Sequence, residues 1–156
     1  MSDPSKDKNL APVRDRALAC LARREHSRLE LTRKLERAGY SAADIEPLLD
    51  EFSRRGWLSN RRFAESYVQQ KQQRFGALKL AHELRGRGVD ESTIQQLMAA
   101  AKESELERAG AVWKKRFGVP PSNASEKAKQ MRFMQSRGFN TATIQLIIRT
   151  PADNDQ

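Results

Sequence analysis

Apolar and polar positions repeat in three stretches of the chain that lie about fifty residues apart. Each stretch has an apolar residue, a glycine four positions later, a second apolar residue directly after the glycine, then a polar residue and, four positions beyond that, an isoleucine. A period of this length is typical of stacked supersecondary units that are each too small to bury an apolar face alone. The stretches span residues 35–45, 84–94 and 134–144, and successive glycines are 49 and 50 residues apart.

Each stretch predicts a tight turn between two helices. The glycine can adopt the left-handed backbone conformation that ends one helix, and the polar residue two positions later can cap the next helix. The apolar residue after the glycine can contact both the last apolar residue of the first helix and the isoleucine of the second. The predicted structural turn residues are Gly39, Gly88 and Gly138, each followed by its apolar clamp, Tyr40, Val89 or Phe139.

Helical spacing of apolar residues fills the chain between these turns. Phe63, Ala64, Tyr67 and Val68 form one stripe, and Leu106 begins another that continues to Phe117. Pro47 is the local misfit, because a proline inside the third helix should bend that helix or move its start. Helix caps are predicted at Ser27, Ser41 and Asn60, and helix ends at Gly56, Gly76 and Gly118.

The predicted fold is all-α, with three tandem three-helix repeat units that form an elongated, curved row of about nine helices. Repeat 1 is predicted to span residues 13–59, repeat 2 residues 60–103 and repeat 3 residues 104–150. Flexible segments are expected at both ends, over residues 1–12 and over the acidic tail, residues 151–156.

Composition limits the classes of protein that fit this chain. No apolar run is long enough to span a bilayer, and the amino-terminal residues lack the apolar region of a secretory signal, so a cytoplasmic location is expected. The single cysteine, Cys20, cannot form an internal disulfide, and its apolar neighbours predict a small buried hydrophobe.

Positive charge rises toward the carboxyl end of the chain. The 29 Lys and Arg residues exceed the 20 Asp and Glu residues by nine, and the three repeats carry +2, +3 and +6 in order. Such an excess favours a polyanionic partner, either nucleic acid or an acidic groove on a protein bound to nucleic acid. The alternative is a solvated basic surface without a specific contact.

Basic residues in repeat 3 gather in two places and give the candidate contact residues. Phe133 lies beside Lys129 and Arg132 at helical spacing, and it either contacts a nucleic-acid base or a protein pocket, or packs on a neighbouring repeat. The candidates for contact with nucleic acid or a protein partner are Lys114, Lys115, Arg116, Lys127, Lys129, Arg132 and Phe133, with Arg24, Arg74 and Lys79 as secondary candidates.

Enzyme chemistry has little support in the sequence. His26 and His82 lie in different repeats without a Cys or His at metal-ligand spacing, so both are predicted to be surface or boundary residues. A glycine-rich phosphate loop and a nucleophile elbow are both missing from the sequence. Carboxylates lie mostly beside cations at helix-surface spacing, as Glu30 does. We therefore predict no catalytic, metal-binding or cofactor-binding residue and no small-molecule substrate.

Three segments carry a family resemblance: REHSRLELTRKL at residues 24–35, GWLSNRRFA at residues 56–64, and GALKLAHEL at residues 76–84 with Gly88 and Val89. Together they resemble the bacterial regulatory protein RecX family. The resemblance covers roughly residues 13–150, is densest in repeats 1 and 2, and in repeat 3 is weak apart from the turn at Gly138 and Phe139. Where the family usually has Asp, this chain has Asn60, and either residue can cap a helix.

The resemblance implies three tandem three-helix units and a regulator of the RecA recombinase. Proteins of this family are understood to bind RecA and its nucleoprotein filament in the helical groove. They restrain filament growth, ATP hydrolysis, strand exchange and the stimulation of repressor self-cleavage. The implied partners are RecA and the RecA–DNA filament; direct weak binding to DNA stays open, and no cofactor or membrane is implied.

A transcriptional regulator is the strongest competing interpretation. Residues 31–57, with a short turn at Gly39, resemble a helix-turn-helix whose second helix would enter the major groove. That helix carries Asp44, Glu46, Asp50 and Glu51, which phosphates would repel, and its first turn lacks Arg, Asn or Gln to read bases. The charge pattern therefore disfavours this interpretation, and an enzyme ranks third.

Overall fold

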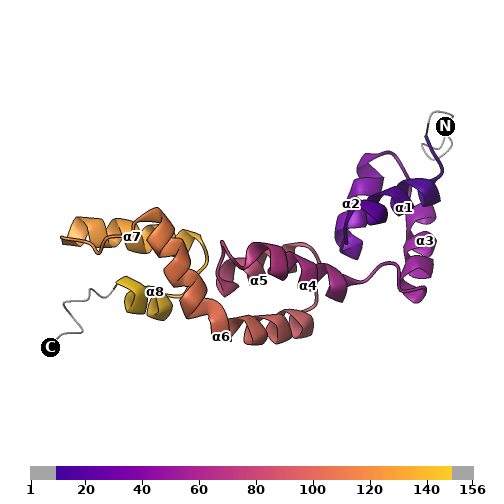
Figure 1. Cartoon of the computed structure of the whole chain (residues 1–156). Coiled ribbons are helices and arrows are strands. Elements are labelled where there is room, and N and C mark those ends of the chain that lie inside the picture. The colour runs from indigo at the N-terminus through magenta and orange to yellow at the C-terminus, as the bar shows by residue number, and fades with distance from the viewer. Residues whose placement is uncertain (1–9, 149–156) are drawn as a thin grey trace. The chain divides into compact units, whose positions relative to one another are not determined.

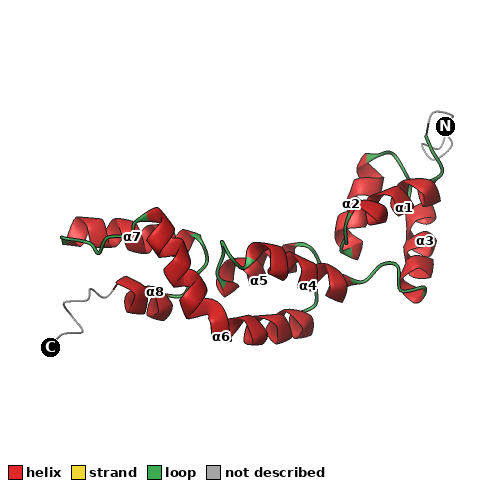
Figure 2. Ribbon diagram, viewed as in Figure 1, coloured by secondary structure: helices red, strands yellow, loops and turns green. Residues whose placement is uncertain are grey.

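The computed structural model describes residues 10–148, which form eight helices and no strand (Figures 1 and 2). The all-α prediction is confirmed. The helices are α1 (Val13–Arg23), α2 (Arg28–Arg37), α3 (Ala42–Arg54), α4 (Asn60–Lys71), α5 (Ala77–Gly86), α6 (Glu91–Arg116), α7 (Ala124–Ser136) and α8 (Thr141–Ile148).

The number of helices in this part of the chain differs from the predicted nine because α6 is one continuous helix of 26 residues. The predicted boundary of repeats 2 and 3, between Glu103 and Ser104, lies inside this helix. Neither glycine nor proline interrupts residues 99–109, and most residues there are good helix formers, so nothing local ends the helix. The predicted break is therefore not a helix boundary.

The chain divides into two compact units. The first compact unit comprises Met1–Ser66 and Gly86–Asp90, and the second comprises Tyr67–Arg85 and Glu91–Gln156. The division falls within α4 and near the end of α5, so it does not follow the boundaries of the repeats. Each compact unit is described by itself below.

The three repeated turns form as predicted. All three glycines have positive φ, with values of 105°, 79° and 89° for Gly39, Gly88 and Gly138. The amide of Tyr40 donates to the carbonyl of Leu35 at 3.1 Å, and that of Phe139 donates to the carbonyl of Met134 at 3.3 Å, which is the bonding of a Schellman ending. The nine apolar positions of the pattern are all buried: Leu35, Tyr40, Ile45, Leu84, Val89, Ile94, Met134, Phe139 and Ile144.

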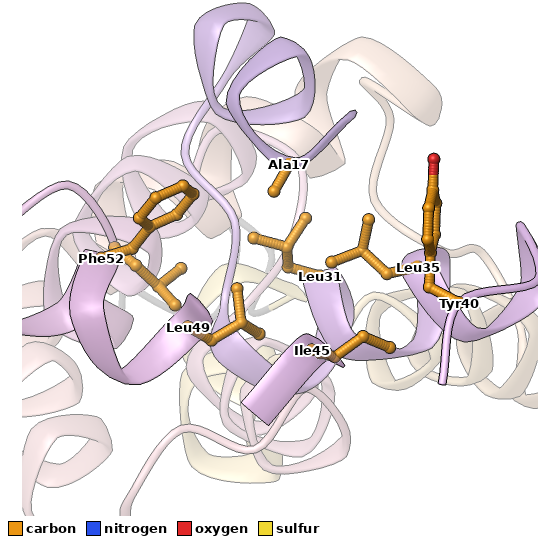
Figure 3. Close-up of a cluster of buried hydrophobic side chains, with 8 residues drawn as sticks. Ala17, Leu31, Leu35, Tyr40, Ile45, Leu49 and Phe52 are labelled. Atoms are coloured by element: carbon orange, nitrogen blue, oxygen red, sulfur yellow. The ribbon is translucent and has the colours of Figure 1, made fainter. Parts of the chain in front are cut away.

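The core of the first compact unit lies between α1, α2 and α3. Figure 3 shows Ala17, Leu31 and Leu49 pointing toward one another from the three helices. The hydroxyl of Tyr40 donates to the carbonyl of Ala11 at 2.6 Å, and Leu10 packs against the same core. Residues 10–12 of the segment predicted to be flexible are described, and of these Leu10 and the carbonyl of Ala11 contact the first core. The remainder of that segment and the predicted acidic tail lie outside the described residues.

The predicted helix caps are confirmed only in part. Ser27 accepts from the amide of Glu30 at 3.1 Å, whereas Ser41 stands at the start of α3 without a side-chain cap bond. The prediction for Asn60 is wrong, because Ser59 accepts from the amide of Arg62 at 3.2 Å and takes that role. The Asn60 side chain instead accepts from the amide of Arg28 at 2.8 Å, which ties α4 to the start of α2.

Pro47 and Gly76 were both expected to interrupt or end a helix, and neither does so in the predicted way. Helix α3 begins at Ala42 and continues through Pro47, so the proline does not move its start. Gly76 does not end a helix in the left-handed conformation, since α4 ends at Lys71 and Gly76 is not among the glycines with positive φ. A Cβ at Gly76 would lie 2.4 Å from the carbonyl oxygen of Gly138, so glycine is required there by close backbone contact. Gly56 and Gly118 do have positive φ, as predicted.

The core of the second compact unit lies where α8 packs against α6 and α7. Trp113 of α6 donates through Nε1 to the side chain of Gln130 on α7 at 2.8 Å. Gln130 in turn donates to the carbonyl of Val119 at 3.1 Å, which holds the loop between these helices. The buried residues of this core are Ala109, Met134, Phe139, Ile144 and Ile148.

Candidate functional site

An open cleft of about 940 Å³ lies in the second compact unit, against α6 and the ends of α4 and α7. Its lining is strongly basic, because five cations face one carboxylate, that of Glu107. The cleft is lined by Gln72, Gln73, Arg74, Ser104, Glu107, Arg108, Ala111, Val112, Lys115, Arg116, Phe133 and Arg137.

The backbone beneath the cleft joins the start of α5 to the end of α7. The amide of Gly76 donates to the carbonyl of Arg137 at 2.7 Å, and the amide of Leu78 donates to the carbonyl of Gly138 at 3.1 Å. The first amides of a helix and the last carbonyls of another lack partners within their own helices. The amides at the start of α5 and the carbonyls at the end of α7 therefore serve as hydrogen-bond partners for each other. The bond to the carbonyl of Arg137 also fixes the main-chain position of that residue.

Two side chains of α6 hold the loop between α4 and α5. Glu105 is buried and accepts from the amide of Ala77 at 3.0 Å. The guanidinium of Arg108 donates to the carbonyls of Gln72 at 2.5 Å and Phe75 at 3.2 Å. Burial lowers the pKa of Arg108 from its ordinary value and the charge of Glu105 opposes this, but an arginine stays protonated.

Aromatic rings lie against three of the other four cations of the cleft. Arg116 lies 5.2 Å and Arg137 lies 5.1 Å from the centroid of the Phe133 ring. Arg137 also lies 5.4 Å from the Phe75 ring, which Lys79 approaches to 4.5 Å. A cation–π contact contributes roughly 0.5–2 kcal/mol, depending on how far the cation is removed from water, and it leaves the positive charge unneutralised.

The six basic candidates of repeat 3 are all exposed in the second compact unit. None forms an ion pair with another residue in the described part of the chain. The structure places Lys115 and Arg116 in the lining of the cleft, whereas the other four lie outside that lining: Lys114, Lys127, Lys129 and Arg132.

Phe133 combines features of the two environments predicted for it. The ring is half-buried, packs against the core of the second compact unit, and meets Phe117 edge-on at 5.4 Å between centroids. These packing partners belong to repeat 3 itself. It nevertheless lines the cleft.

The secondary candidates do not gather at one place. Arg74 lines the cleft and lies 5.7 Å from the Phe75 ring, on which Lys79 also packs. Arg24 belongs to the first compact unit, where it donates to both carboxylate oxygens of Glu30 at 2.9 Å. This hydrogen bonding to Glu30 raises the pKa of Arg24, although partial burial opposes the change.

Sequence reasoning did not single out Arg108, Arg137, Phe75 or Phe117 as site residues. One available signal was the triplet Arg-Phe-Gly, which occurs at residues 74–76 and again at residues 116–118. The sequence analysis treats both triplets only as helix ends, whereas each phenylalanine packs against cations. Arg137 had the weaker signal of standing directly before a repeated turn glycine.

His26 is buried, so its predicted surface or boundary position is wrong. Its Nε2 lies 2.8 Å from Nζ of Lys34, and its Nδ1 lies 3.0 Å from the carbonyl oxygen of Arg24. Because a lysine ammonium only donates, Nε2 accepts, Nδ1–H donates, and the ring is neutral. Burial lowers the pKa of His26, and the charges of Arg24 and Lys34 add to this effect. His82 is exposed, as predicted, and Cys20 is partly buried against the first core.

Residues 10–148 contain neither a cluster of metal ligands nor a membrane-spanning helix. Within that range, no cluster of three or more His, Cys, Asp or Glu side chains could hold a metal ion. None of the described helices has both the length and the apolar character needed to cross a membrane.

Three protein-family models match the chain in order along its length. The model of the RecX first three-helix domain matches residues 14–52. The model of the second three-helix domain matches residues 59–98, and that of the third matches residues 103–148. The third match spans nearly all of repeat 3, where the resemblance read from the sequence is weak apart from the Gly138 turn.

Curated relatives with the name Regulatory protein RecX align with most of the chain. The relative from Ralstonia nicotianae is 44% identical over 137 residues, which cover 88% of this chain and 86% of that protein. The relative from Herminiimonas arsenicoxydans is 41% identical over 143 residues, with 92% and 95% covered. A relative from Neisseria gonorrhoeae is 38% identical, with 92% and 93% covered.

Two solved structures share the fold at 20% sequence identity. The crystal structure of regulatory protein RecX gives a TM-score of 0.76 and covers 86% of this chain and 70% of that chain. The crystal structure of RecX from Lactobacillus salivarius gives a TM-score of 0.71 and covers 94% of both chains. From the three domain matches and the identity of 38–44% to curated relatives, this chain belongs to the RecX family of regulatory proteins.

Proposed function

We propose that this protein binds the RecA recombinase and its nucleoprotein filament, and that it restrains filament extension, ATP hydrolysis, strand exchange and co-protease activity. It would thereby modulate DNA repair and the SOS response in the cytoplasm, without catalysis of its own. The observation that carries the proposal is the presence of all three RecX three-helix domains in order in one chain.

The charge of the second compact unit supports this proposal. That unit carries 14 Lys and Arg residues against 8 Asp and Glu residues. A RecA–DNA filament contains nucleic acid and is therefore polyanionic, so exposed unpaired cations would speed the encounter and stabilise the complex. The proposed contacts are Lys114, Lys115, Arg116, Lys127, Lys129, Arg132 and Phe133.

The helix-turn-helix alternative gains no support from α3. Asp44, Glu46 and Asp50 are exposed on this helix. Arg28 pairs with Asp50 at 2.7 Å and with Glu46 at 3.4 Å, but it supplies one positive charge for two carboxylates. A helix with this net negative face is poorly suited to the phosphates that border a major groove.

The test is ATP hydrolysis by purified RecA on single-stranded DNA in the presence of increasing amounts of this protein. We expect hydrolysis to fall as the protein is added, together with a shortening of filaments seen by electron microscopy. Unchanged hydrolysis, combined with failure of the protein to sediment with RecA filaments, would overturn the proposal.

A further inference from the structure

The cleft of the second compact unit has one strongly basic end and one end of mixed polarity. Arg116 and Arg137 lie at the basic end, against the ring of Phe133, whereas Ser104 and Glu107 line the other end. We propose that this cleft binds a nucleoside triphosphate as a ligand that is not turned over, with the phosphates at the basic end and the base at the other. This binding goes beyond the proposed function, because it requires no RecA.

The two ends of the cleft are separated along helix α6. Ser104 and Glu107 precede Arg116 on this continuous helix by about 18 Å and about 13 Å, at 1.5 Å per residue. Near Ser104, the guanidinium of Arg108 donates to the Ser104 hydroxyl and to main-chain carbonyls, including that of Gln72. This cation therefore holds the frame and does not contact the ligand. The carboxylate of Glu107 would repel a phosphate at the same end.

The contacts of Arg116 and Arg137 leave their hydrogen-bonding groups available to an anion. Both guanidinia lie against one ring, so they are close enough to reach a single ligand. Neither forms an ion pair or a side-chain hydrogen bond with another described residue. A guanidinium held against a ring loses little freedom when an anion binds, and its N–H donors can form charge-assisted, bidentate hydrogen bonds to a phosphate.

Further cations add to the positive field at the basic end. Lys115 precedes Arg116 and is exposed in the lining. Arg74 belongs to the same end, because the Phe75 ring lies 5.7 Å from Arg74 and 5.4 Å from Arg137. The net charge of the whole lining is +4, from five cations and one carboxylate, which suits a ligand with several adjacent negative charges.

The other end of the cleft offers the groups that a base requires. The side-chain amides of Gln72 and Gln73 line it and have no hydrogen-bond partner among the described residues. An amide both donates and accepts, and the carboxylate of Glu107 accepts, so these groups match the donors and acceptors on the edge of a base. Ala111 and Val112 provide apolar wall between the two ends, as is usual in sites for small ligands.

The size of the cleft and the distribution of its charges favour a small ligand over a polymer. A volume of about 940 Å³ lies within the range of small-molecule sites. A nucleic-acid strand or an acidic peptide carries negative charge along its length, so it would place anionic groups beside Glu107. A nucleoside triphosphate carries its charge at one end only, which fits the asymmetry of the lining.

The frame of the cleft is rigid before any ligand arrives. The bond from Gly76 to the carbonyl of Arg137 fixes the main chain at this anion-binding residue. Glu105 accepts from the amide of Ala77 and, with Arg108, fixes the loop between α4 and α5. Preorganised groups bind with a smaller entropic cost, which favours a binding site over charges that lie near each other by chance.

Binding can be measured by isothermal titration calorimetry of ATP into the full chain, without RecA and with EDTA present so that Mg²⁺ does not neutralise the phosphates. In the variant Arg116→Gln/Arg137→Gln we expect affinity to fall about tenfold or more, since charge-assisted bonds to phosphate are lost. The affinity of the parent should fall as salt is added.

Inorganic tripolyphosphate separates recognition of the base from recognition of the phosphates. We expect ATP to bind the parent about tenfold more tightly than tripolyphosphate, because the base adds hydrogen bonds and apolar contact. Gln73→Ala, at an exposed position, should reduce this advantage of ATP and leave the affinity for tripolyphosphate within about twofold of the parent.

The matched control is Arg33→Gln/Arg37→Gln in α2, which removes the same charge from two exposed residues of the first compact unit. We expect its affinity for ATP to stay within about twofold of the parent, because only the long-range field changes. Arg116→Glu alone, at an exposed site, provides a second variant in case Arg137→Gln impairs folding, which circular dichroism would report.

Three results would overturn the proposal. Equal weakening by the cleft variant and the control would show that net charge, and not the cleft, attracts the ligand. Equal affinity for ATP and tripolyphosphate would show that no base is recognised. Binding of polyglutamate or oligothymidylate but not of ATP, with dependence on Arg116, would show that the cleft serves a polymer. Inhibition of RecA is measured on the same proteins, so a failure of nucleotide binding is distinguished from a failure of the proposed function.

Discussion

Both compact units contain ring-packed and carboxylate-paired arginines, but three arginines of each unit form two sets with different partners. In the first compact unit Arg24, Arg28 and Arg62 pair with carboxylates at 2.7–2.9 Å. In the second, Arg74, Arg116 and Arg137 lie 5.1–5.8 Å from the centroids of aromatic rings. A carboxylate cancels the charge of its partner, whereas a ring positions a cation and leaves its charge available to an anion.

The difference extends to net charge. The first compact unit has 15 Lys and Arg residues against 12 Asp and Glu residues, and the second has 14 against 8. The two units therefore contain nearly the same number of cations, and the second has fewer carboxylates to neutralise them. The second compact unit therefore has more positive charge available for binding because it contains fewer Asp and Glu residues and because aromatic rings lie against three of its arginines. It does not contain more Lys and Arg residues than the first unit.

The largest effect on stability is expected from Gly138→Ala. This substitution would disturb the main-chain contact between the end of α7 and the start of α5, next to Arg137. A Cβ at this position would lie 2.3 Å from Cβ and 2.6 Å from the main-chain nitrogen of Lys79. We expect a loss of about 3 kcal/mol in the free energy of unfolding, from positive φ together with overpacking. Denaturant melts measure this loss.

Gly39→Ala is the matched control in the first compact unit. Its φ is also positive, but a Cβ there would meet only Cδ1 of Leu10, at 3.5 Å. We expect a loss of about 1 kcal/mol, from backbone strain alone. Equal losses at the two glycines would contradict the close packing described for Gly138.

Gly88→Val should have the next largest effect. Gly88 has a φ of 79°, and a Cβ would lie 3.0 Å from Cβ of Leu29 in the first compact unit. A β-branched residue is strained in this conformation, so we expect a loss of about 2 kcal/mol, measured by thermal melts. Melts indistinguishable from those of the parent would count against the turn.

Neutralising the exposed cations of the second compact unit should weaken binding to the RecA filament without unfolding the protein. We expect the variant with Lys114, Lys115, Lys127, Lys129 and Arg132 all changed to Gln to bind about tenfold more weakly at low salt, with a flatter salt dependence. Its melting temperature should change little, because exposed charges contribute little to stability. Inhibition of RecA as strong as that of the parent across a salt series would place the contact surface elsewhere.

A smaller, pH-dependent effect is expected in the first compact unit, from His26. Burial lowers its pKa in the folded state, so the unfolded chain binds a proton more readily, and stability should fall as pH drops below about 6.5. The decrease should level off below the pKa of the folded state. Glu30 has a lowered pKa too, so its contribution is present above about pH 4.5 and is lost only below that value.

Denaturant midpoints measured between pH 7.5 and 5.5 isolate the histidine. The control is His26→Gln, which lacks the titrating ring and should flatten the dependence on pH in that range. An unchanged slope in the variant would show that other groups produce the effect.

The fold was largely predictable because its determinants are local. Gly39 and Gly138 end helices through main-chain hydrogen bonds within a few residues, and the apolar clamps follow directly in sequence. One error came from a place where local chemistry permits two outcomes. Ser59 and Asn60 can both cap a helix, and only the tertiary contact of Asn60 with Arg28 separates their roles.

The cleft was predictable only in part because its contacts are distant in sequence. Lys115 and Arg116 were predicted from a basic run, and Phe133 from its position among cations. Arg137 becomes a site residue through its contacts with Phe75 and the amide of Gly76, about sixty residues earlier in the chain. No periodicity predicts which cation a ring will hold.

The most direct test of the difference between the two compact units is the salt dependence of binding to RecA filaments on single-stranded DNA. Two charge-matched triple variants are compared: Arg74→Gln/Arg116→Gln/Arg137→Gln and Arg24→Gln/Arg28→Gln/Arg62→Gln. We predict a slope of log affinity against log salt that is smaller by about 2 for the ring-held set and nearly unchanged for the carboxylate-paired set. Equal decreases for both sets would contradict a special role for the ring-held arginines.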